Sequence, residues 1–338
     1  MSDRVLAVVG ATGAVGRTMV DILQERDFPL GSLRLVASPR SKGSVVATRW
    51  GEVTVESLEE FDPSGVDLAL FSAGGERARQ FAPVFAAAGA VVIDNSSAFR
   101  MEDDVPLVVA SVNDEALAGH HGIIANPNCS TMTLVMAVAP LHRAAGLVSM
   151  VATTYQSVSG SGQKAVAELE RQTHALLGDT EALVTGGWSD PGSEVFVRPI
   201  AFNVLPFAGA EGAEGYTDEE WKLVYESRKI LDAPDIAVEP TCVRVPVMTG
   251  HGVAASAWFR RPMPVSEAAA LIEGAPGVEL WTDYVPTPLD SAGRDDVLVG
   301  RLRATAGKPG GINLWTVSDN LRKGAALNAI QIAELLVS

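Results

Sequence analysis

A cysteine stands where an apolar strand gives way to a helix. Residues 123–125 are apolar, and the segment NPNCST at residues 126–131 follows them. Pro127 forbids a helix before it, whereas Ser and Thr suit the opening turn of one. Cys129 is therefore expected at a helix N-terminus, where the helix dipole lowers the pKa of a thiol and favours a nucleophilic thiolate. A free cysteine is also often a small buried apolar residue, so position alone leaves both interpretations open.

One histidine is set as an acid–base group would be. His251 lies between two glycines, so we expect little crowding of its side chain and an exposed backbone, as would suit an acid–base group. Residues 241–247 (TCVRVPV) alternate like a strand and place Cys242 and Arg244 on one face. Because a strand interior offers no helix N-terminus, we assign Cys242 a structural role. The other four histidines are interpreted as surface or packing residues: His120, His121, His142 and His174.

A glycine-rich loop near the start of the chain indicates a dinucleotide. Residues 4–9 form an apolar run typical of a buried parallel strand, and a helical pattern covers residues 17–23. Between them glycines recur as G-x-x-G-x-x-G, which allows a tight turn and close approach of the backbone to a pyrophosphate. This context favours cofactor binding over a turn without a ligand. The predicted contacts are Gly10, Thr12, Gly13, Ala14 and Val15.

The end of the second strand, residues 33–37, indicates which dinucleotide binds. An NAD enzyme would place Asp or Glu there for the ribose 2′-hydroxyl. This chain instead has Ser38, Arg40 and Ser41, and a guanidinium suits a 2′-phosphate. The pattern predicts NADP(H), although Arg40 could also be a solvated loop cation. Ser72 ends another strand just before a small-residue turn and is a further predicted cofactor contact.

Strands and helices alternate through the first third of the chain. After residues 4–9 and 33–37, further strands are expected at 66–72, 90–94 and 107–110, with a helix at 77–88. This alternation predicts a Rossmann-type doubly wound parallel sheet, with ligands at the carboxyl ends of the strands. Arg100 lies in such a carboxyl-end loop and could face an anion, or it could be a surface charge.

The remainder of the chain lacks the regular alternation of strands and helices. We expect a strand at 148–156, a flexible loop at 157–162, a helix at 164–177 and a long irregular region at 178–215 that suits an interface arm or a lid. A helix at 217–231 places Glu219 and Lys222 on one face, either as a site or as a solvated ion pair. A strand at 313–317 and a helix at 322–337 end the chain, and the helix is expected to pack back onto the first domain. The predicted domains are residues 1–127 plus 321–338, and residues 128–320.

Composition excludes several classes of protein. The 338 residues carry a net charge of −15, which argues against nucleic acid or an anionic membrane as a partner. No stretch approaches the roughly 18 apolar residues of a membrane span. The start of the chain lacks the pattern of a signal peptide, and two cysteines fit a reducing cytoplasm. No metal site is predicted.

Several long motifs together resemble the aspartate-β-semialdehyde dehydrogenase family. Besides the glycine loop, they are DNSSAFRM (94–101), NPNCST (126–131), TYQSVSGSGQ (154–163), TCVRVPV with GH (241–251), PTPLD (286–290) and SDNLRKGAALNAIQIAELL (318–336). The resemblance runs from end to end in the same order. It implies NADPH-dependent reductive dephosphorylation of aspartyl phosphate to aspartate semialdehyde, releasing phosphate. The pathway leads to lysine through diaminopimelate, to methionine, and to threonine and isoleucine. The resemblance also implies a homodimer and an α+β second domain of the glyceraldehyde-3-phosphate-dehydrogenase-like type.

The resemblance assigns a role to each matching residue. It makes Cys129 the acyl-thioester nucleophile and a protonated His251 the proton donor. The remaining assignments are Gln156 for positioning the substrate; Arg244, Glu219 and Asn128 for binding it; Arg100 and Lys222 for phosphate; and Ser159, Gly160 and Asn320 for the nicotinamide half of the cofactor. One departure bears on the chemistry, because the family commonly has Ser-Glu where this chain has Gly252-Val253.

Two alternatives remain. N-acetyl-γ-glutamyl-phosphate reductase has the same fold and chemistry, but it should show Gly before the cysteine and Tyr or Phe after it, where this chain has Asn128 and Ser130. A non-catalytic NADP-binding relative should have lost the cysteine, the histidine or the arginine, and all three are present.

Overall fold

The computed structural model describes residues 4–338 and divides them into two compact units. The first unit comprises residues 4–139, 225–234 and 321–338, and the second comprises 140–224 and 235–320. The predicted boundary between residues 127 and 128 stays a prediction. Residues 1–3, which bear on the expected absence of a signal peptide, lie outside the described part.

The first unit is built on a seven-stranded sheet in the order β3-β4-β2-β1-β5-β6-β7. All neighbours pair in parallel except β3 and β4, which form an antiparallel hairpin that the sequence analysis did not predict. The strands are β1 (Val5–Val9), β2 (Ser32–Ala37), β3 (Val45–Thr48), β4 (Gly51–Ser57), β5 (Leu68–Phe71), β6 (Val91–Asp94) and β7 (Ile123–Ala125). The helices are α1 (Ala14–Glu25), α2 (Gly75–Ala87) and α9 (Leu327–Val337), with a π-helical turn at Arg322–Ala326.

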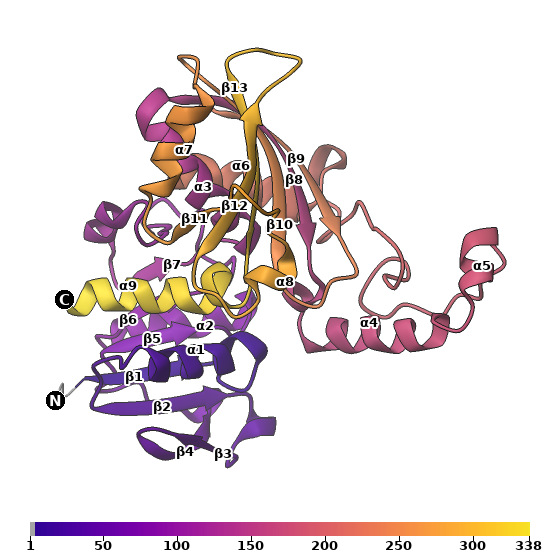
Figure 1. Cartoon of the computed structure of the whole chain (residues 1–338). Helices are drawn as coiled ribbons and strands as arrows, with labels where there is room; N and C mark the ends of the chain where they lie inside the picture. The colour runs from indigo at the N-terminus through magenta and orange to yellow at the C-terminus, as the bar shows by residue number, and fades with distance from the viewer. Residues whose placement is uncertain (1–3) are drawn as a thin grey trace. The chain divides into compact units, whose positions relative to one another are not determined.

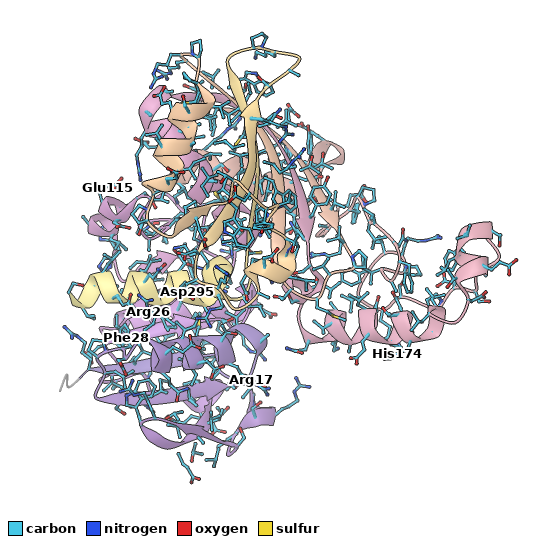
Figure 2. All side chains as sticks on the ribbon, in the orientation of Figure 1. Arg17, Arg26, Phe28, Glu115, His174 and Asp295 are labelled. Atoms are coloured by element: carbon cyan, nitrogen blue, oxygen red, sulfur yellow. The ribbon has the colours of Figure 1, made fainter. Side chains whose placement is uncertain are left out.

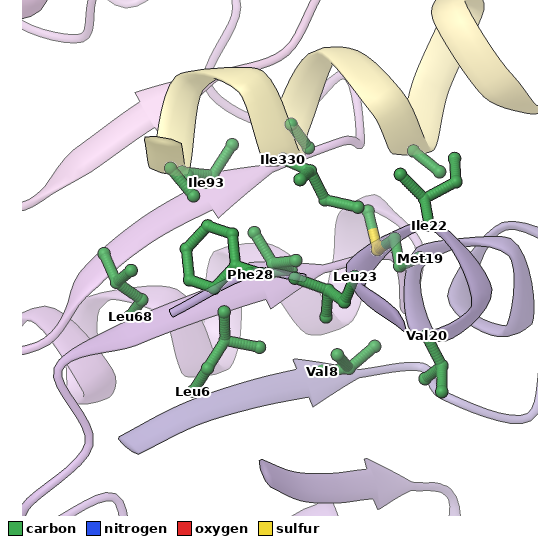
Figure 3. Packing of buried hydrophobic residues seen from close by; sticks show 14 of the residues in the cluster. Leu6, Val8, Met19, Val20, Ile22, Leu23, Phe28, Leu68, Ile93 and Ile330 are labelled. Atoms are coloured by element: carbon green, nitrogen blue, oxygen red, sulfur yellow. The ribbon is translucent and has the colours of Figure 1, made fainter. Parts of the chain in front are cut away.

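Helices cover both faces of this sheet, because alternate residues of β1 enter two separate cores. Leu6 and Val8 pack with α1 and with α9, including Ile330 (Figure 3), whereas Ala7 and Val9 pack with Phe85 of α2. The doubly wound sheet and the return of the C-terminal helix to the first domain are thereby confirmed. Arg26, the C-cap residue of α1 and labelled in Figure 2, also forms an ion pair with Glu334 of α9 at 2.7 Å.

One strand expected in this unit is absent. Leu107 forms only an isolated bridge to Ala125, and residues 107–110 do not continue as a strand. Hydrogen bonds from a side-chain amide, rather than strand pairing, satisfy the backbone polar groups of this segment. The Asn328 amide accepts from the Ala110 N–H at 2.9 Å and donates to the Val108 carbonyl at 2.9 Å. The apolar pattern of these residues therefore reflects burial rather than strand pairing.

The second unit contains a mixed six-stranded sheet in the order β11-β12-β13-β10-β8-β9 (Figure 1). Its strands are β8 (Leu147–Gln156), β9 (Ala237–Arg244), β10 (His251–Phe259), β11 (Val278–Leu280), β12 (Val297–Ala304) and β13 (Gly311–Ser318). Its helices are α4 (Gln163–Leu176), α5 (Thr180–Thr185), α7 (Val265–Glu273) and α8 (Pro288–Ser291). The expected α+β character is confirmed. The irregular region 178–215 contains a short α-helix, α5, and a 3-10 turn at Ala213–Gly215.

Two helices cross the division between the units. They are α3 (Cys129–Ala145) and α6 (Asp218–Ile230). Within residues 4–338, no helix is both long and apolar enough to span a bilayer.

Candidate functional site

The glycine loop lies at the topological switch point of the first unit. The chain leaves β1 for β2 on one side and later returns to β5 on the other, and Gly10 and Ser72 follow β1 and β5 directly. Gly10 has φ +92°, and a Cβ on it would lie 2.3 Å from the Ser72 carbonyl oxygen. A Cβ on Gly16 would lie 2.2 Å from the Gly10 carbonyl oxygen. The tight packing of this loop therefore requires glycine at both positions.

The helix that follows the loop opens without a side-chain cap. Gly13 is the N-cap residue of α1 and provides no side-chain hydrogen bond, so the first N–H groups of α1 point to where an anion would be stabilised. Thr12 Oγ1 and Ser41 Oγ lie 3.2 Å apart, which brings two predicted cofactor residues together. Arg40 is exposed and forms no ion pair within the described chain, whereas its neighbour Lys42 pairs with Glu60. These residues fit a phosphorylated dinucleotide.

Cys129 is the first residue of α3 and lies at the same sheet edge as the glycine loop. It follows β7, three strands from β1, so about 14 Å of sheet separates the two features. Asn128 caps the helix, because its Oδ1 accepts from the N–H groups of Ser130 at 2.9 Å and Thr131 at 3.3 Å. The Cys129 side chain is partly exposed. Its position at a capped helix N-terminus agrees with the sequence analysis.

The second cysteine, Cys242, is buried, unlike the partly exposed Cys129. Cys242 is fully buried in β9, and this burial raises the pKa of its thiol to about 12. It therefore stays protonated near neutral pH, as its assigned structural role requires.

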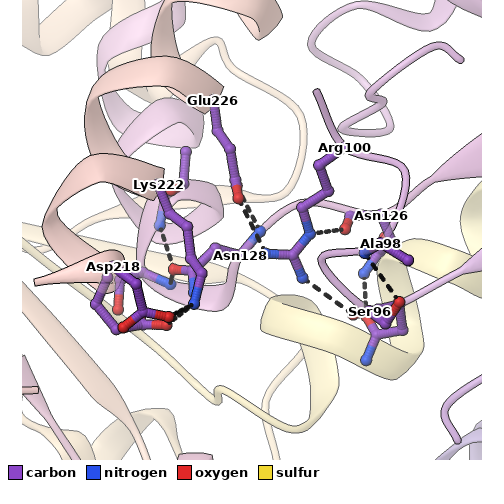
Figure 4. Close-up of polar contacts among 12 residues, drawn as sticks. Ser96, Ala98, Arg100, Asn126, Asn128, Asp218, Lys222 and Glu226 are labelled. Carbon is purple, nitrogen blue, oxygen red and sulfur yellow. Dashed lines mark hydrogen bonds and ion pairs between the residues drawn. The ribbon is translucent and has the colours of Figure 1, made fainter. Parts of the chain in front are cut away.

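Arg100 is buried, contrary to the alternative of a surface charge. It donates from Nη1 to Glu226 at 2.9 Å, from Nε to the Asn126 carbonyl at 2.9 Å and from Nη2 to the Asn95 carbonyl at 3.0 Å (Figure 4). Two of the five N–H groups of a guanidinium then remain for another anion. The sequence analysis missed Glu226. Its spacing of seven residues from Glu219 and four from Lys222 on a helix was the available signal.

His251 in the second unit is fully buried at the start of β10, whereas its flanking glycines had predicted an uncrowded side chain and an exposed backbone. Its Nδ1 accepts a hydrogen bond from the Ser157 backbone N–H at 3.1 Å. Since a backbone N–H can only donate, Nδ1 is unprotonated and the ring proton is on Nε2. Burial and the nearby charge of Arg244 lower the pKa of His251 to about 3, with Glu219 and the Gly250 backbone opposing them. The acceptor geometry at Nδ1 and the lowered pKa favour a neutral imidazole in this structure, whereas the sequence analysis expected a protonated one during the reaction.

A polar cluster holds this imidazole. Asn320 Oδ1 accepts from the Gly250 N–H at 2.8 Å and from Ser157 Oγ at 3.1 Å, and Asn320 Nδ2 donates to Ser159 Oγ at 2.9 Å. Ser159 and Asn320, both predicted cofactor residues, are thus brought together beside His251. The expected flexible loop at 157–162 contains a 3-10 turn at Val158–Ser161. Ser157 was missed, because a contact through its backbone leaves no signature of residue type.

Gly160 leaves space where two charged or polar groups converge. A Cβ on it would lie 2.9 Å from His251 Nε2 and 3.2 Å from Arg244 Nη1. His251 Nε2 is buried and has no hydrogen-bond partner in the described part of the chain. The Nε2–H is therefore available to an oxygen of a bound molecule at this point.

Arg244 is buried and oriented from two sides. Its Nη1 donates to the Ser157 carbonyl at 2.7 Å, and its guanidinium carbon lies 5.8 Å from the centre of the Phe196 ring. Its backbone pairs with Leu205, so part of the irregular region 178–215 packs along the edge of β9.

Lys222, Glu219 and Gln156 form a connected group. Lys222 Nζ donates to Glu219 Oε1 and to Asp218 Oδ2, each at 2.7 Å, and Gln156 Nε2 lies 3.4 Å from Glu219 Oε2. Burial would lower the pKa of Lys222, but the carboxylates of Glu219 and Asp218 outweigh it and raise the pKa above its usual range. With 14 % and 23 % of their side chains exposed, Glu219 and Lys222 are a largely buried pair rather than a solvated one.

None of the other four histidines is fully buried, although Nδ1 of His120 and Nδ1 of His142 each accept from a backbone N–H. His174, labelled in Figure 2, is exposed on α4, and His121 is exposed in a loop.

Known proteins resemble this chain over its whole length. Residues 5–120 match the model of the semialdehyde dehydrogenase NAD binding domain, and residues 138–323 match that of the semialdehyde dehydrogenase dimerisation domain. Aspartate-semialdehyde dehydrogenase of Mycolicibacterium smegmatis is 49% identical over 98% of this chain and 99% of its own length. Aspartate-semialdehyde dehydrogenase 2 of Vibrio cholerae is 47% identical over 98% and 97%.

Solved structures agree. The crystal structure of aspartate semialdehyde dehydrogenase II from Vibrio cholerae complexed with ASA has a TM-score of 0.94 at 47% identity, covering 100% of this chain and 99% of that one. A probable aspartate-semialdehyde dehydrogenase from Pseudomonas aeruginosa has a TM-score of 0.91 at 35% identity, covering 100% and 99%.

Proposed function

The chain belongs to the semialdehyde dehydrogenase family, and we propose that it reduces L-4-aspartyl phosphate to L-aspartate 4-semialdehyde with NADPH and releases phosphate. The observation that carries the proposal is the placement of Cys129 at a capped helix N-terminus on the sheet edge that also holds the glycine loop. The product is an intermediate on the way to lysine, threonine, isoleucine and methionine.

Cys129 is the nucleophile. Its thiolate attacks the acyl carbon, so that a C–S bond forms while the bond to the phosphate oxygen breaks and phosphate leaves with the electron pair. The N-terminus of α3 stabilises the thiolate before this attack. Arg100, through its two remaining N–H groups, and Lys222, kept charged by its carboxylate partners, bind the phosphate.

Bound NADPH would supply the hydride that reduces the thioester. The residues that would hold it are the Gly10–Gly16 loop with Thr12, Ala14 and Val15, together with Ser72, Ser159, Gly160 and Asn320; Ser38, Arg40 and Ser41 would take the 2′-phosphate.

His251 stabilises the oxyanion that reduction produces. Its neutral Nε2–H donates a hydrogen bond to the thioester oxygen. When the C–O⁻ electrons re-form the carbonyl, the C–S bond breaks, and the aldehyde leaves while Cys129 regains its thiolate. Neither the reduction of the thioester nor the release of the aldehyde requires His251 to transfer a proton, so a neutral imidazole can fulfil this role.

The substrate is anchored by charge. Arg244 binds the α-carboxylate with its forked guanidinium, and Glu219 faces the ammonium. Gln156 and Asn128 position the acyl group. The requirement for a free ammonium distinguishes this substrate from an N-acetylated one.

The functional form is a homodimer that acts in the cytoplasm. Residues 138–323 match a dimerisation domain, and one face of β8 presents Val151 and Tyr155 to solvent at 46% and 37% exposure. A reduced Cys129 thiol suits a reducing compartment.

The test is a phosphate-dependent oxidation assay with NADP. L-aspartate 4-semialdehyde should be oxidised and N-acetylglutamate semialdehyde should not. Preference for the acetylated aldehyde would assign the chain to the reductase of that substrate, and no NADP reduction with either would favour a non-catalytic role. Sedimentation of the purified protein should give twice the mass of one chain.

A further inference from the structure

A buried ion pair joins α6 to the loop that follows β6. Glu226 Oε1 and Arg100 Nη1 lie 2.9 Å apart, and their side chains are 1% and 9% exposed (Figure 4). Both residues belong to the first unit, as does Cys129.

The pair holds the backbone on both sides of Pro127. Arg100 Nε donates to the carbonyl of Asn126 at 2.9 Å, and Glu226 Oε2 accepts from the backbone N–H of Asn128 at 2.7 Å. Proline has no N–H to offer. One carboxylate thus fixes the backbone of the residue that caps α3 and precedes the nucleophile.

The loop that carries Arg100 is fixed independently of Glu226. Lys229 Nζ donates to the carbonyl oxygens of Arg100 at 2.9 Å, Glu102 at 2.7 Å and Val105 at 2.9 Å. Removal of the Glu226 charge should therefore leave the Arg100 backbone in place and change chiefly the charge balance around it.

We infer that Glu226 is a positioning residue for the nucleophile, which acts through Asn128 and Arg100. It orients the N-cap of α3, and it compensates the Arg100 charge so that the helix N-terminus, rather than an unbalanced guanidinium, sets the acidity of the Cys129 thiol. The inference rests on the proposed role of Cys129.

The charges around this turn determine whether a change at Glu226 makes the Cys129 thiol more or less acidic. The cations are Arg100 and Lys229, with Arg79 acting on Asp94; the carboxyl groups are Glu226 and Asp94, with Glu102, Asp103 and Asp104 acting on Lys229. Burial raises the pKa of Asp94, although hydrogen bonds from Ser96 and the charges of Arg100 and Arg79 oppose the effect. A glutamine at 226 could still accept from the Asn128 N–H, but it would leave the Arg100 charge uncompensated. An uncompensated cation favours a thiolate.

The experiment is the pH dependence of alkylation by iodoacetamide in the full-length protein. Cys242 is buried with a thiol pKa raised to about 12, so the reaction reports on Cys129. Glu226→Gln should move the alkylation midpoint to lower pH. Below the midpoint, the reaction should become about tenfold faster for each pH unit by which the midpoint falls. Glu226→Ala, which also loses the acceptor for Asn128, should reduce kcat at least tenfold with unchanged NADPH binding.

Glu220→Gln is the matched control. Glu220 is a buried carboxylate of the same helix and accepts from the backbone N–H groups of Thr217 at 2.7 Å and Cys242 at 2.9 Å. This variant should keep the wild-type alkylation profile. An unchanged profile in a folded Glu226→Gln protein would overturn the inference, as would the same displacement of the midpoint in Glu220→Gln. Turnover that survives Cys129→Ala would instead overturn the proposed function.

Discussion

The backbone N–H of Ser157 donates to Nδ1 of His251 at 3.1 Å, and this contact fixes the tautomer of a fully buried imidazole. The family that the sequence resembles commonly has Ser-Glu after the histidine, where this chain has Gly252-Val253. Here Gly252 leaves no room for a side chain, because a Cβ would lie 2.2 Å from the Trp315 ring. In this chain the ring is oriented by Ser157, whose hydroxyl is in turn bonded to Asn320.

The buried neutral imidazole should make stability depend on pH. The pKa of His251 is about 3 in the folded protein and near 6.5 when unfolded. The unfolded chain therefore binds the proton first, so the contribution of His251 is complete above pH 6.5 and is lost as the pH falls towards 3. Between pH 7.5 and pH 5 the loss should be roughly 2 kcal/mol. Urea unfolding should show that wild type loses this much more than His251→Gln; equal losses would mean that the ring is protonated in the fold.

Gly160→Ala should impair turnover without impairing folding. The backbone conformation of Gly160 is open to alanine, but the added Cβ would crowd His251 Nε2 and Arg244 Nη1 at 2.9 and 3.2 Å. We expect kcat/KM to fall on the order of 10²-fold, as for a displacement of about 1 Å in a site, with little change in Tm. Gly178→Ala is the control, since its Cβ would meet nothing within 4 Å. Equal activities of the two variants would show that Gly160 is not part of the site.

Arg40→Ala should weaken selectivity for NADPH. Arg40 is exposed beside Ser41, whose hydroxyl meets Thr12 of the glycine loop. Loss of a guanidinium–phosphate contact of about 1.5–3 kcal/mol should raise the KM for NADPH by about one to two orders of magnitude and leave that for NADH unchanged. Lys42→Ala, whose amine already pairs with Glu60, should have little effect. Equal use of both nucleotides by the wild type would contradict the assignment.

Local patterns predicted the first domain well. The strand, glycine loop and helix of residues 4–25, and the start of a helix at Cys129, depend on neighbouring residues and were visible in the sequence. The burial of His251 was not visible, because its flanking glycines suggested an uncrowded side chain and an exposed backbone. In the structure, β8 and β13 enclose its strand from both sides.

Long-range charge pairs could not be predicted from the sequence either. Glu226 meets Arg100 and Asn128, which precede it by 126 and 98 residues. Only the resemblance to a family connected Cys129, Arg244 and His251, since no local pattern relates three segments so far apart. The apolar residues 107–110 were mistaken for a strand. A buried apolar segment has the same sequence pattern whether its backbone pairs with a strand or, as here, with the side-chain amide of Asn328.

The central claim is that Cys129 carries the acyl group. Phosphate-dependent oxidation of L-aspartate 4-semialdehyde should be measured for Cys129→Ala beside Cys242→Ala, together with NADPH binding by fluorescence. We expect Cys129→Ala to abolish turnover while binding NADPH as the wild type does, and Cys242→Ala to remain active where it folds. Substantial turnover by Cys129→Ala would contradict the thioester mechanism.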